Sequence, residues 1–314
     1  MNQNPNPKIL FLNHHKSQCG VYEYGVRLYT ILKDSQQYNV SYKEVGNAED
    51  YNQIPFAAYK VVIYNYHMST MNWLHHGNIT KQSVNVGILH ECAVNLFHHT
   101  WNIDPYATHG VPRPLIHEFD GILRSSNPKI HDFVHYGQEK NVPIIGSFGF
   151  GFTNKGFDKI VSYVNEQYDH AIIKLLMPFA TYGDSNGSLS TQVARLCKEK
   201  NTKPNIEVVI CHEYFDNHDI LYFLASNNVN MFLYDTMHGR GISSVIDYAL
   251  SVQTPICISD SYMFRHMYDD RICAYKTSIE DSIKNSQLLL PRYRTLWNKQ
   301  NALETLESYL VTMI

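Results

Sequence analysis

A short loop with the pattern His-Gly-Arg-Gly lies at residues 238–241, between an apolar run and a run with helical periodicity. Glycines let the main chain approach a ligand closely, and a guanidinium matches the geometry of a phosphate. Two serines follow, where the N–H groups of a new helix are free to bind an anion. A surface arginine in a flexible turn is the alternative. The candidates for binding a diphosphate are Gly239, Arg240, Gly241, Ser243 and Ser244.

A second loop of the same kind, GFGFTNKG, covers residues 149–156. Gly149 and Gly151 follow an apolar strand, and Lys155 and Gly156 open the next helix. An ammonium group and free helix N–H groups then point the same way, which suits a phosphate. The order of residues matches neither the phosphate-binding loop of nucleoside triphosphatases nor the dinucleotide fingerprint. A solvated lysine at the start of a helix is the alternative.

Two further candidates follow strands in the first half of the chain. Gly20 opens a helix after the run KILFLN, and a plain tight turn is its alternative role. His90 and Glu91 come at the end of the run SVNVGILH. Because histidine titrates near neutral pH, His90 could act as a base, as a hydrogen-bond donor or as a ligand for sugar hydroxyls. A histidine that only supports the fold is the alternative.

Three pairs of adjacent histidines, at residues 14–15, 75–76 and 98–99, raise the question of a metal site. Neighbouring side chains on a strand or helix point in different directions, and the spacing His-Glu-x-x-His is missing from the sequence. We therefore expect no structural or catalytic metal.

The elements that must position these residues alternate between strand-like and helical runs, which indicates an α/β fold with parallel sheets. In such sheets ligands bind beyond the carboxyl ends of the strands, where all of these candidates fall. A helix is expected from Val21, and others over 156–168 and 242–252. The strands are expected at residues 8–13, 39–45, 60–66, 83–90, 121–126, 143–151, 171–178, 206–214, 228–235 and 255–260.

The alternation restarts once, which predicts two successive α/β domains of ordinary size. We expect them at residues 1–140 and 141–290, joined by a short polar segment at 139–143 that could act as a hinge. Residues 291–314 contain an amphipathic helical run that closes the chain.

Composition excludes several other classes of protein. The 314 residues carry a net charge of −3, which argues against a protein that binds duplex nucleic acid. No apolar run approaches the roughly 20 residues that span a membrane, and the N-terminus lacks the apolar core of a signal peptide. The 6 cysteines form no Cys-x-x-Cys pair and are typical of reduced thiols. A cytoplasmic protein is expected.

Together these segments resemble the GT-B fold glycosyltransferases, most closely the family-4 type (glycosyl transferases group 1). The resemblance covers nearly the whole chain, and the segments that carry it are CGVYEYGVRLYTIL, GILHE, GSFGFGFTNKGFDKIV and HGRGISSVIDYALSVQTPICIS. It implies two Rossmann-like domains facing across a cleft. The acceptor would bind to residues 1–140 and the nucleotide-sugar donor to 141–290, and the helix in 291–314 would cross back onto the first domain.

The resemblance also implies roles for single residues. Gly20 matches the glycine-rich loop near the donor diphosphate, His90 the histidine that ends a strand, and Lys155 the lysine that holds the donor phosphates. Phe150 replaces the usual arginine, and we infer that Arg240 takes over its charge. His238 stands where the first of two paired glutamates is expected, and Asp247 is the acidic residue near the place of the second. The candidates for the donor sugar or nucleoside are His238, Ile242 and Asp247.

The implied activity is transfer of a sugar from a nucleotide-diphosphate donor to an acceptor hydroxyl, with retention of configuration and without a metal or other cofactor. If the reaction inverts instead, His90 or Glu91 is the expected base. The acceptor is a sugar, a lipid-linked molecule or a small molecule, and a peripheral contact with a membrane stays open. A nucleotide-sugar epimerase and a non-catalytic nucleotide-sugar binding protein are the alternatives.

Overall fold

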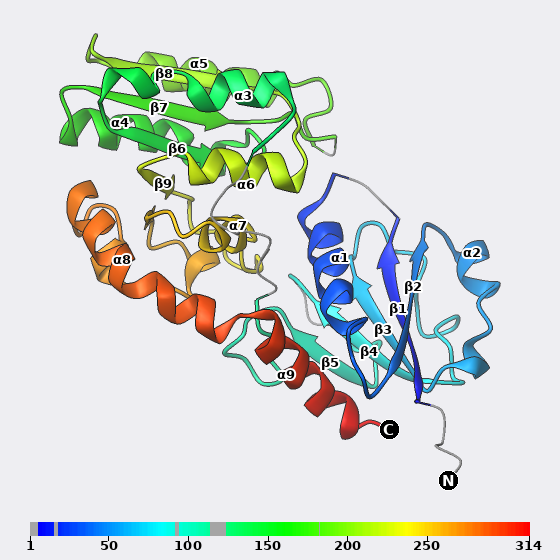
Figure 1. The fold of residues 1–314 in the computed structure, drawn as a ribbon. Coiled ribbons are helices and arrows are strands. Elements are labelled where there is room, and N and C mark those ends of the chain that lie inside the picture. Colours follow the sequence, from blue (N-terminus) through cyan, green and yellow to red (C-terminus); the bar gives the residue numbers. More distant parts are fainter. Residues whose placement is uncertain (1–5, 16–17, 92–93, 114–123, 182) are drawn as a thin grey trace. The chain divides into compact units, whose positions relative to one another are not determined.

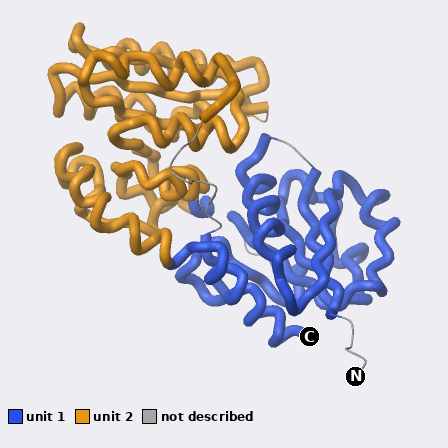
Figure 2. The backbone as a smooth tube through the Cα atoms, viewed as in Figure 1, with its two compact units in different colours: residues 1–115, 239–242, 296–314 blue, residues 116–238, 243–295 orange. Residues whose placement is uncertain are grey.

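The computed structural model describes residues 6–15, 18–91, 94–113, 124–181 and 183–314. The chain divides into two compact units, which Figure 2 colours separately. Unit 1 comprises residues 1–115, 239–242 and 296–314, and unit 2 comprises residues 116–238 and 243–295. The chain therefore enters unit 2, returns briefly to unit 1 through residues 239–242, and ends in unit 1.

Unit 1 contains a five-stranded parallel sheet in the order β2-β1-β3-β4-β5 (Figure 1). The central strand β3 is buried along its whole length, as expected for a parallel sheet that is covered on both faces. The strands are β1 (Lys8–His14), β2 (Asn39–Val45), β3 (Val61–Tyr66), β4 (Val84–Leu89) and β5 (His99–Asn102).

Alternate residues of these strands enter two different cores. Ile9 and Phe11 pack with helices α1 (Gly20–Leu32) and α9 (Lys299–Val311) on one face, and Leu10 and Leu12 pack with the segment around Tyr51 on the other. That segment holds helix α2 (Ala48–Asn52) and the short 3-10 helix η1 (Phe56–Ala58). Because α9 contributes Leu306 and Leu310 to the core, the end of the chain is part of unit 1.

Unit 2 repeats the arrangement with the order β10-β9-β6-β7-β8, again all parallel. Its strands are β6 (Ile144–Phe148), β7 (Ala171–Leu176), β8 (Ile206–Cys211), β9 (Val229–Phe232) and β10 (Ile256–Ile258). Its helices are α3 (Pro128–His135), α4 (Phe157–Gln167), α5 (Ser188–Lys200), α6 (Asn217–Ala225), α7 (Val245–Ser251) and α8 (Ile279–Leu296). The short 3-10 helices are η2 (Gln138–Lys140), η3 (Thr153–Lys155), η4 (Tyr262–Phe264) and η5 (Asp270–Ile272).

The core of unit 2 lies between the sheet and helices α4 and α5. Phe157, Ile160 and Val164 of α4 and Val193 of α5 pack against inward residues of the sheet such as Ile173. Helices α3 and α6 contact each other away from this core, where the rings of Phe133 and Phe223 meet at 5.2 Å. Among the described residues, no helix is both long and apolar enough to cross a membrane.

The predicted α/β class with two parallel sheets is confirmed, and most predicted strands lie within two or three residues of the observed ones. The structure differs from the sequence-based expectations at two places, and a third expectation lies largely outside the described residues. The helix expected from 242 begins at Val245. The edge strand β5 was not predicted, because its sequence HTWN is short and polar. The strand expected at 121–126 lies largely outside the described residues, and residues 124–126 have no regular structure.

Candidate functional site

The carboxyl edge of the sheet in unit 2 carries the lysine that the sequence singled out. Lys155 ends helix η3, and its ammonium lies 4.1 Å from the ring centre of Tyr234, which follows β9. The aromatic ring is fully buried, so it forms a rigid face under a half-buried cation. Such a cation–π contact attracts the ammonium by up to about 2 kcal/mol when it is desolvated.

Gly156 joins this loop to helix α4 at a point that admits no side chain. Its φ is +64°, and a Cβ there would lie 2.0 Å from the carbonyl oxygen of Leu233. The main-chain N–H of Asp235 donates to the carbonyl of Asn154 at 2.9 Å, and Lys159 forms an ion pair with Asp235. The loop after β6 is therefore fastened to the segment after β9, and α4 begins without a capping side chain.

The other two glycines of this loop serve different purposes. Gly149 adopts φ +142°, and a Cβ there would lie 3.3 Å from the hydroxyl of Tyr234. Gly151 is buried against Ser190 of α5, where a Cβ would come within 2.7 Å of the serine main chain. Phe150, in the place of the arginine expected from the resemblance, lies 6.4 Å from the ring of Phe152. Close packing explains Gly151, and the positive φ explains Gly149.

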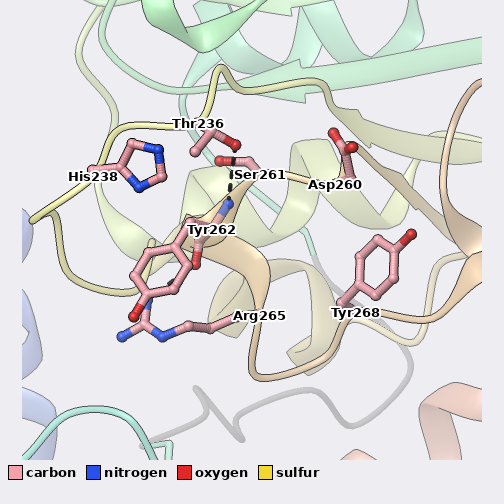
Figure 3. Close-up of a pocket in the computed structure, with 7 residues that line it drawn as sticks. All are labelled: Thr236, His238, Asp260, Ser261, Tyr262, Arg265 and Tyr268. Carbon is pink, nitrogen blue, oxygen red and sulfur yellow. Dashed lines mark hydrogen bonds between the residues drawn. The ribbon is translucent and has the colours of Figure 1, made fainter.

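A cavity of about 370 Å³ opens beside this edge, between the segments that follow β9 and β10 (Figure 3). This volume falls within the range of small-molecule sites, about 300–1,000 Å³. The predicted His238 lies at one side of the cavity, and its ring centre is 6.4 Å from that of Tyr262. The lining residues are Thr236, His238, Asp260, Ser261, Tyr262, Arg265 and Tyr268.

The lining of this cavity combines aromatic faces with polar groups. The guanidinium of Arg265 stacks 4.1 Å from the ring centre of Tyr262 and donates to its carbonyl oxygen. Ser261 donates to the main chain of Asp235, which ties the cavity to the loop that carries Lys155. Asp260 is exposed and offers a carboxylate. Aromatic rings, hydroxyls and a carboxylate can bind a polyhydroxyl ligand by its apolar face and by its hydroxyl groups.

The carboxyl edge of unit 1 carries His90, in a network of amide side chains that fixes its proton. Asn65 donates from Nδ2 to Oδ1 of Asn13 at 2.8 Å and to the carbonyl of Val21, so its Oδ1 must be the acceptor. His90 Nε2 lies 2.7 Å from that oxygen and therefore carries the hydrogen. This tautomer leaves Nδ1 of His90 as a hydrogen-bond acceptor. Burial, with a smaller effect of the Arg113 charge, lowers the pKa of His90 to about 3.

Glu91 and Arg240 form an ion pair, with one guanidinium nitrogen 2.8 and 2.9 Å from the two carboxylate oxygens. Both side chains are about half exposed. Gly241 presses against the end of β4, because a Cβ there would lie 2.0 Å from the carbonyl oxygen of His90. Gly239 has φ +80° and open space around it. The two glycines thus allow residues 239–241 to lie against the end of β4 within unit 1.

The remaining predicted site residues differ in their exposure to solvent: Gly20 is exposed, and the other three are buried. Gly20 is exposed at the first position of α1, and its N-cap residue Cys19 makes no side-chain hydrogen bond to the helix. Ile242 is part of the apolar core of unit 1, and Asp247 of α7 is fully buried. Ser243 is buried before α7, where its N–H donates to the carbonyl of Met263.

Sequence reasoning considered His14 only as one of a pair for a metal, and it missed several other residues that these edges bring together: His67, Asn13, Asn65, Tyr234, Tyr262 and Arg265. A signal existed for the first three of these, because each lies at or directly after the end of an apolar strand. No group of three or more histidine, cysteine, aspartate or glutamate side chains is placed to hold a metal within the part of the chain that the structure describes. The described cysteines are free thiols.

Comparison with known proteins gives a fold and no sequence family. No protein-family model and no curated protein sequence matches this chain. Among solved structures, HepE of Anabaena in complex with UDP and glucose superposes with a TM-score of 0.70 at 10% identity, over 98% of this chain and 100% of that one. AviGT4, a glycosyltransferase of avilamycin A biosynthesis, gives 0.62 at 10% identity, over 98% and 97%. A glycosyltransferase from Rickettsia africae gives 0.58 at 10% identity, over 99% and 98%. The chain has the GT-B fold of glycosyltransferases.

Proposed function

We propose that this protein is a glycosyltransferase that moves a sugar from a nucleoside-diphosphate donor to an acceptor hydroxyl. The observation that carries the proposal is the cation at the carboxyl edge of unit 2. Lys155 is held on Tyr234 beside the uncapped start of α4, which is suited to a diphosphate. The resemblance to HepE, solved with UDP and with UDP-glucose, supports a UDP-sugar as the donor.

The donor would lie along this edge, with its diphosphate at Gly149, Gly151, Lys155 and Gly156. The adjoining cavity at His238 would take the sugar or the nucleoside, because it combines aromatic faces with Asp260 and hydroxyl groups. Further candidates for the diphosphate are Gly20, Gly239, Arg240, Gly241 and Ser243. Ile242 and Asp247 are buried, so we propose that they act through the backbone of their segment and not by direct contact.

Sugar transfer requires that charge on the leaving diphosphate be stabilised as the sugar becomes cationic. Lys155 and the N–H groups of α4 supply positive charge without a metal, and Arg240 could add a guanidinium. The ion pair of Arg240 with Glu91 is half exposed, so a phosphate could displace the carboxylate at a cost of about 1 kcal/mol or less. We therefore propose a metal-independent reaction.

The weak basicity of His90 in unit 1 supports retention of the anomeric configuration. A histidine with a pKa lowered to about 3 is a weak base, so His90 does not suit the deprotonation of an acceptor hydroxyl in an inverting reaction. Glu91 would suit it only after a phosphate had displaced it from Arg240. We propose instead that the leaving phosphate takes this proton, and that His90 binds the acceptor through Nδ1.

The roles of the domains follow as part of the same proposal. Residues 1–140 would bind the acceptor, residues 141–290 the donor, and the helix within 291–314 would complete the first domain. The acceptor would be a sugar, a lipid-linked molecule or a small molecule.

A thermal-shift screen of nucleotides and nucleotide-sugars tests the donor class, because a ligand that binds only the native state raises the melting temperature. We expect a shift with UDP and a UDP-sugar. If no nucleoside diphosphate shifts the melting temperature, the proposal is wrong. If a nucleotide-sugar binds and is converted with no acceptor present, the protein is an epimerase. Binding without turnover would make it a binding protein.

A further inference from the structure

Three histidines lie at the ends of three neighbouring strands in unit 1. His14 ends β1, His67 directly follows β3, and His90 directly follows β4. Because these strands are adjacent and parallel in the sheet, the three side chains meet at its carboxyl edge. The rings of His14 and His67 are 5.0 Å apart. We call these three residues the histidine edge.

His14 is the unusual member of the histidine edge. Its side chain is fully buried, and neither ring nitrogen makes a geometrically complete hydrogen bond within the part of the chain that the structure describes, although the main chain of His15 acts on the ring to raise its pKa. A buried polar group without a partner costs free energy, so such a group is expected to gain one in a functional state. The ring lies beside His67 and 5.8 Å from the ring of Tyr22, which is in the first turn of α1. A buried imidazole thus lies between the start of a helix and a second histidine.

The other two members have one nitrogen committed. His67 Nδ1 accepts a hydrogen bond from the main-chain N–H of Thr70 at 3.2 Å, which leaves its Nε2 to carry a hydrogen. His90 is held through Nε2 by Asn65. Burial is the largest cause of a lowered pKa at all three, which reaches about 4 at His14 and about 3 at His90. The three histidines are therefore uncharged near neutral pH. One of them can become an imidazolium only if a nearby negative group offsets the free energy lost by burying the charge.

The charged groups around the edge are of both signs, because Glu44 acts on His14, Glu91 on His67 and Arg113 on His90. The first turn of α1 has no capping side chain, and it carries the acidic Glu23. Both carboxylates that act on the histidines are partly compensated, because Glu44 accepts hydrogen bonds from two tyrosine hydroxyls and Glu91 is paired with Arg240. Among the described residues, the titratable and charged groups around the edge are His15, Cys19, Tyr22, Glu23, Tyr42, Glu44, Glu91, Arg113 and Arg240.

We propose that the histidine edge binds a phosphate group of the acceptor and takes up a proton from solvent as it does so. The phosphate would accept hydrogen bonds from His14, from His67 Nε2 and from the N–H groups that begin α1. An imidazole would become an imidazolium, with its charge compensated by the anion. The inference rests on the proposed function, because it names the acceptor of that reaction as a phosphorylated compound.

The test is calorimetric titration of the full-length protein with inorganic sulfate and inorganic phosphate, between about pH 8 and about pH 6. Sulfate stays a dianion over this range, so protons taken up on its binding belong to the protein. Two buffers of different ionisation enthalpy give their number. We expect sulfate affinity to rise about ten-fold or more as the pH falls, with uptake of about one proton. Affinity that is unchanged across this range would overturn the proposal.

Substitutions of His14 and His67 test whether these residues bind the anion. His14→Phe keeps a ring of similar shape and removes the nitrogens, and His67→Gln removes one proton acceptor while keeping the surface polar. Each should lower anion affinity at least about ten-fold at the lower pH, and a melting curve shows whether each is folded. His76→Gln is the matched control, because His76 is exposed on the same unit. Equal anion affinity in the wild type, His14→Phe and His67→Gln would contradict the assignment.

Saturating UDP separates the acceptor phosphate from the donor phosphate. We expect sulfate to bind equally well with and without UDP. If UDP abolishes sulfate binding, the anion site belongs to the donor and the inference is wrong. The UDP titration also reports on the proposed function itself, because absence of UDP binding together with sulfate binding would reject the transferase and not the anion site.

Discussion

At the scale of single residues, the candidate phosphate-binding cations lie in the loops that follow strands. Lys155 lies on the ring of Tyr234, and Arg240 is paired with Glu91. Each contact restricts a flexible cation, so less side-chain entropy is lost when a phosphate binds. The aromatic face under Lys155 thus holds the ammonium group in place.

We expect Lys155→Ala to weaken binding of UDP by about 1.5–3 kcal/mol, the range for hydrogen bonds to charged groups. Tyr234→Leu should cause a smaller loss, because the lysine stays but is no longer held, while Tyr234→Phe should keep most of the affinity. Calorimetry measures each value, and Lys198→Ala, exposed on α5, is the control. UDP affinity that is equal in wild type and Lys155→Ala would show that Lys155 is a solvated lysine.

Release of Arg240 from its carboxylate should strengthen diphosphate binding. Glu91→Gln removes the competing charge, so we expect tighter binding of UDP, with little change for uridine. Arg240→Lys keeps the charge but loses the planar fork and should bind UDP less well than wild type, and Arg240→Ala should bind it less well still. Affinities that do not differ across these variants would remove Arg240 from the donor site.

At the scale of elements, the fold depends on close approaches of main chain that only glycine permits. At Gly156 the start of α4 lies against the carbonyl of Leu233. We expect Gly156→Ala to lower the free energy of unfolding by about 2 kcal/mol or more, through steric overlap and positive φ. Gly239→Ala is the control, because its φ is also positive but its surroundings are open, so its loss should be smaller. Chemical denaturation measures both, and equal losses would show that strain alone acts at Gly156.

Most strands could be predicted from sequence because a parallel strand buried on both faces is a continuous apolar run, as VVIYNY shows in β3. The edge strand β5 could not, since its pairing with β4 and not its composition makes it a strand. The rule that ligands bind at the carboxyl edge placed Lys155 and His90. The contact between Lys155 and Tyr234, and that between His14 and His67, depend on which strands are neighbours, and strand order is not written in local patterns.

At the scale of the whole molecule, the buried histidines should make stability depend on pH. The folded pKa values of His14 and His90, about 4 and about 3, lie below the ordinary value of 6.5, so the unfolded chain binds protons first. The contribution of these two histidines to stability should therefore be constant above about pH 7, and stability should fall as the pH drops below 6.5. Each residue should cost about 2 kcal/mol by about pH 5.

Denaturation with urea at a series of pH values measures this loss, and His14→Phe should reduce it. Sulfate should restore stability at low pH if it binds the histidine edge. A stability that rises between about pH 7 and about pH 5 would contradict the sign argued here, because it would require the folded state to bind protons more strongly.

The measurement that tests the central claim most directly is NMR of a UDP-sugar incubated with the protein, with and without a set of acceptors that includes sugar phosphates. The account predicts that UDP accumulates only when an acceptor is present, and that the new glycosidic bond has the anomeric configuration of the donor. Conversion of the donor without an acceptor, or no release of a nucleoside diphosphate from any donor with any acceptor, would contradict it.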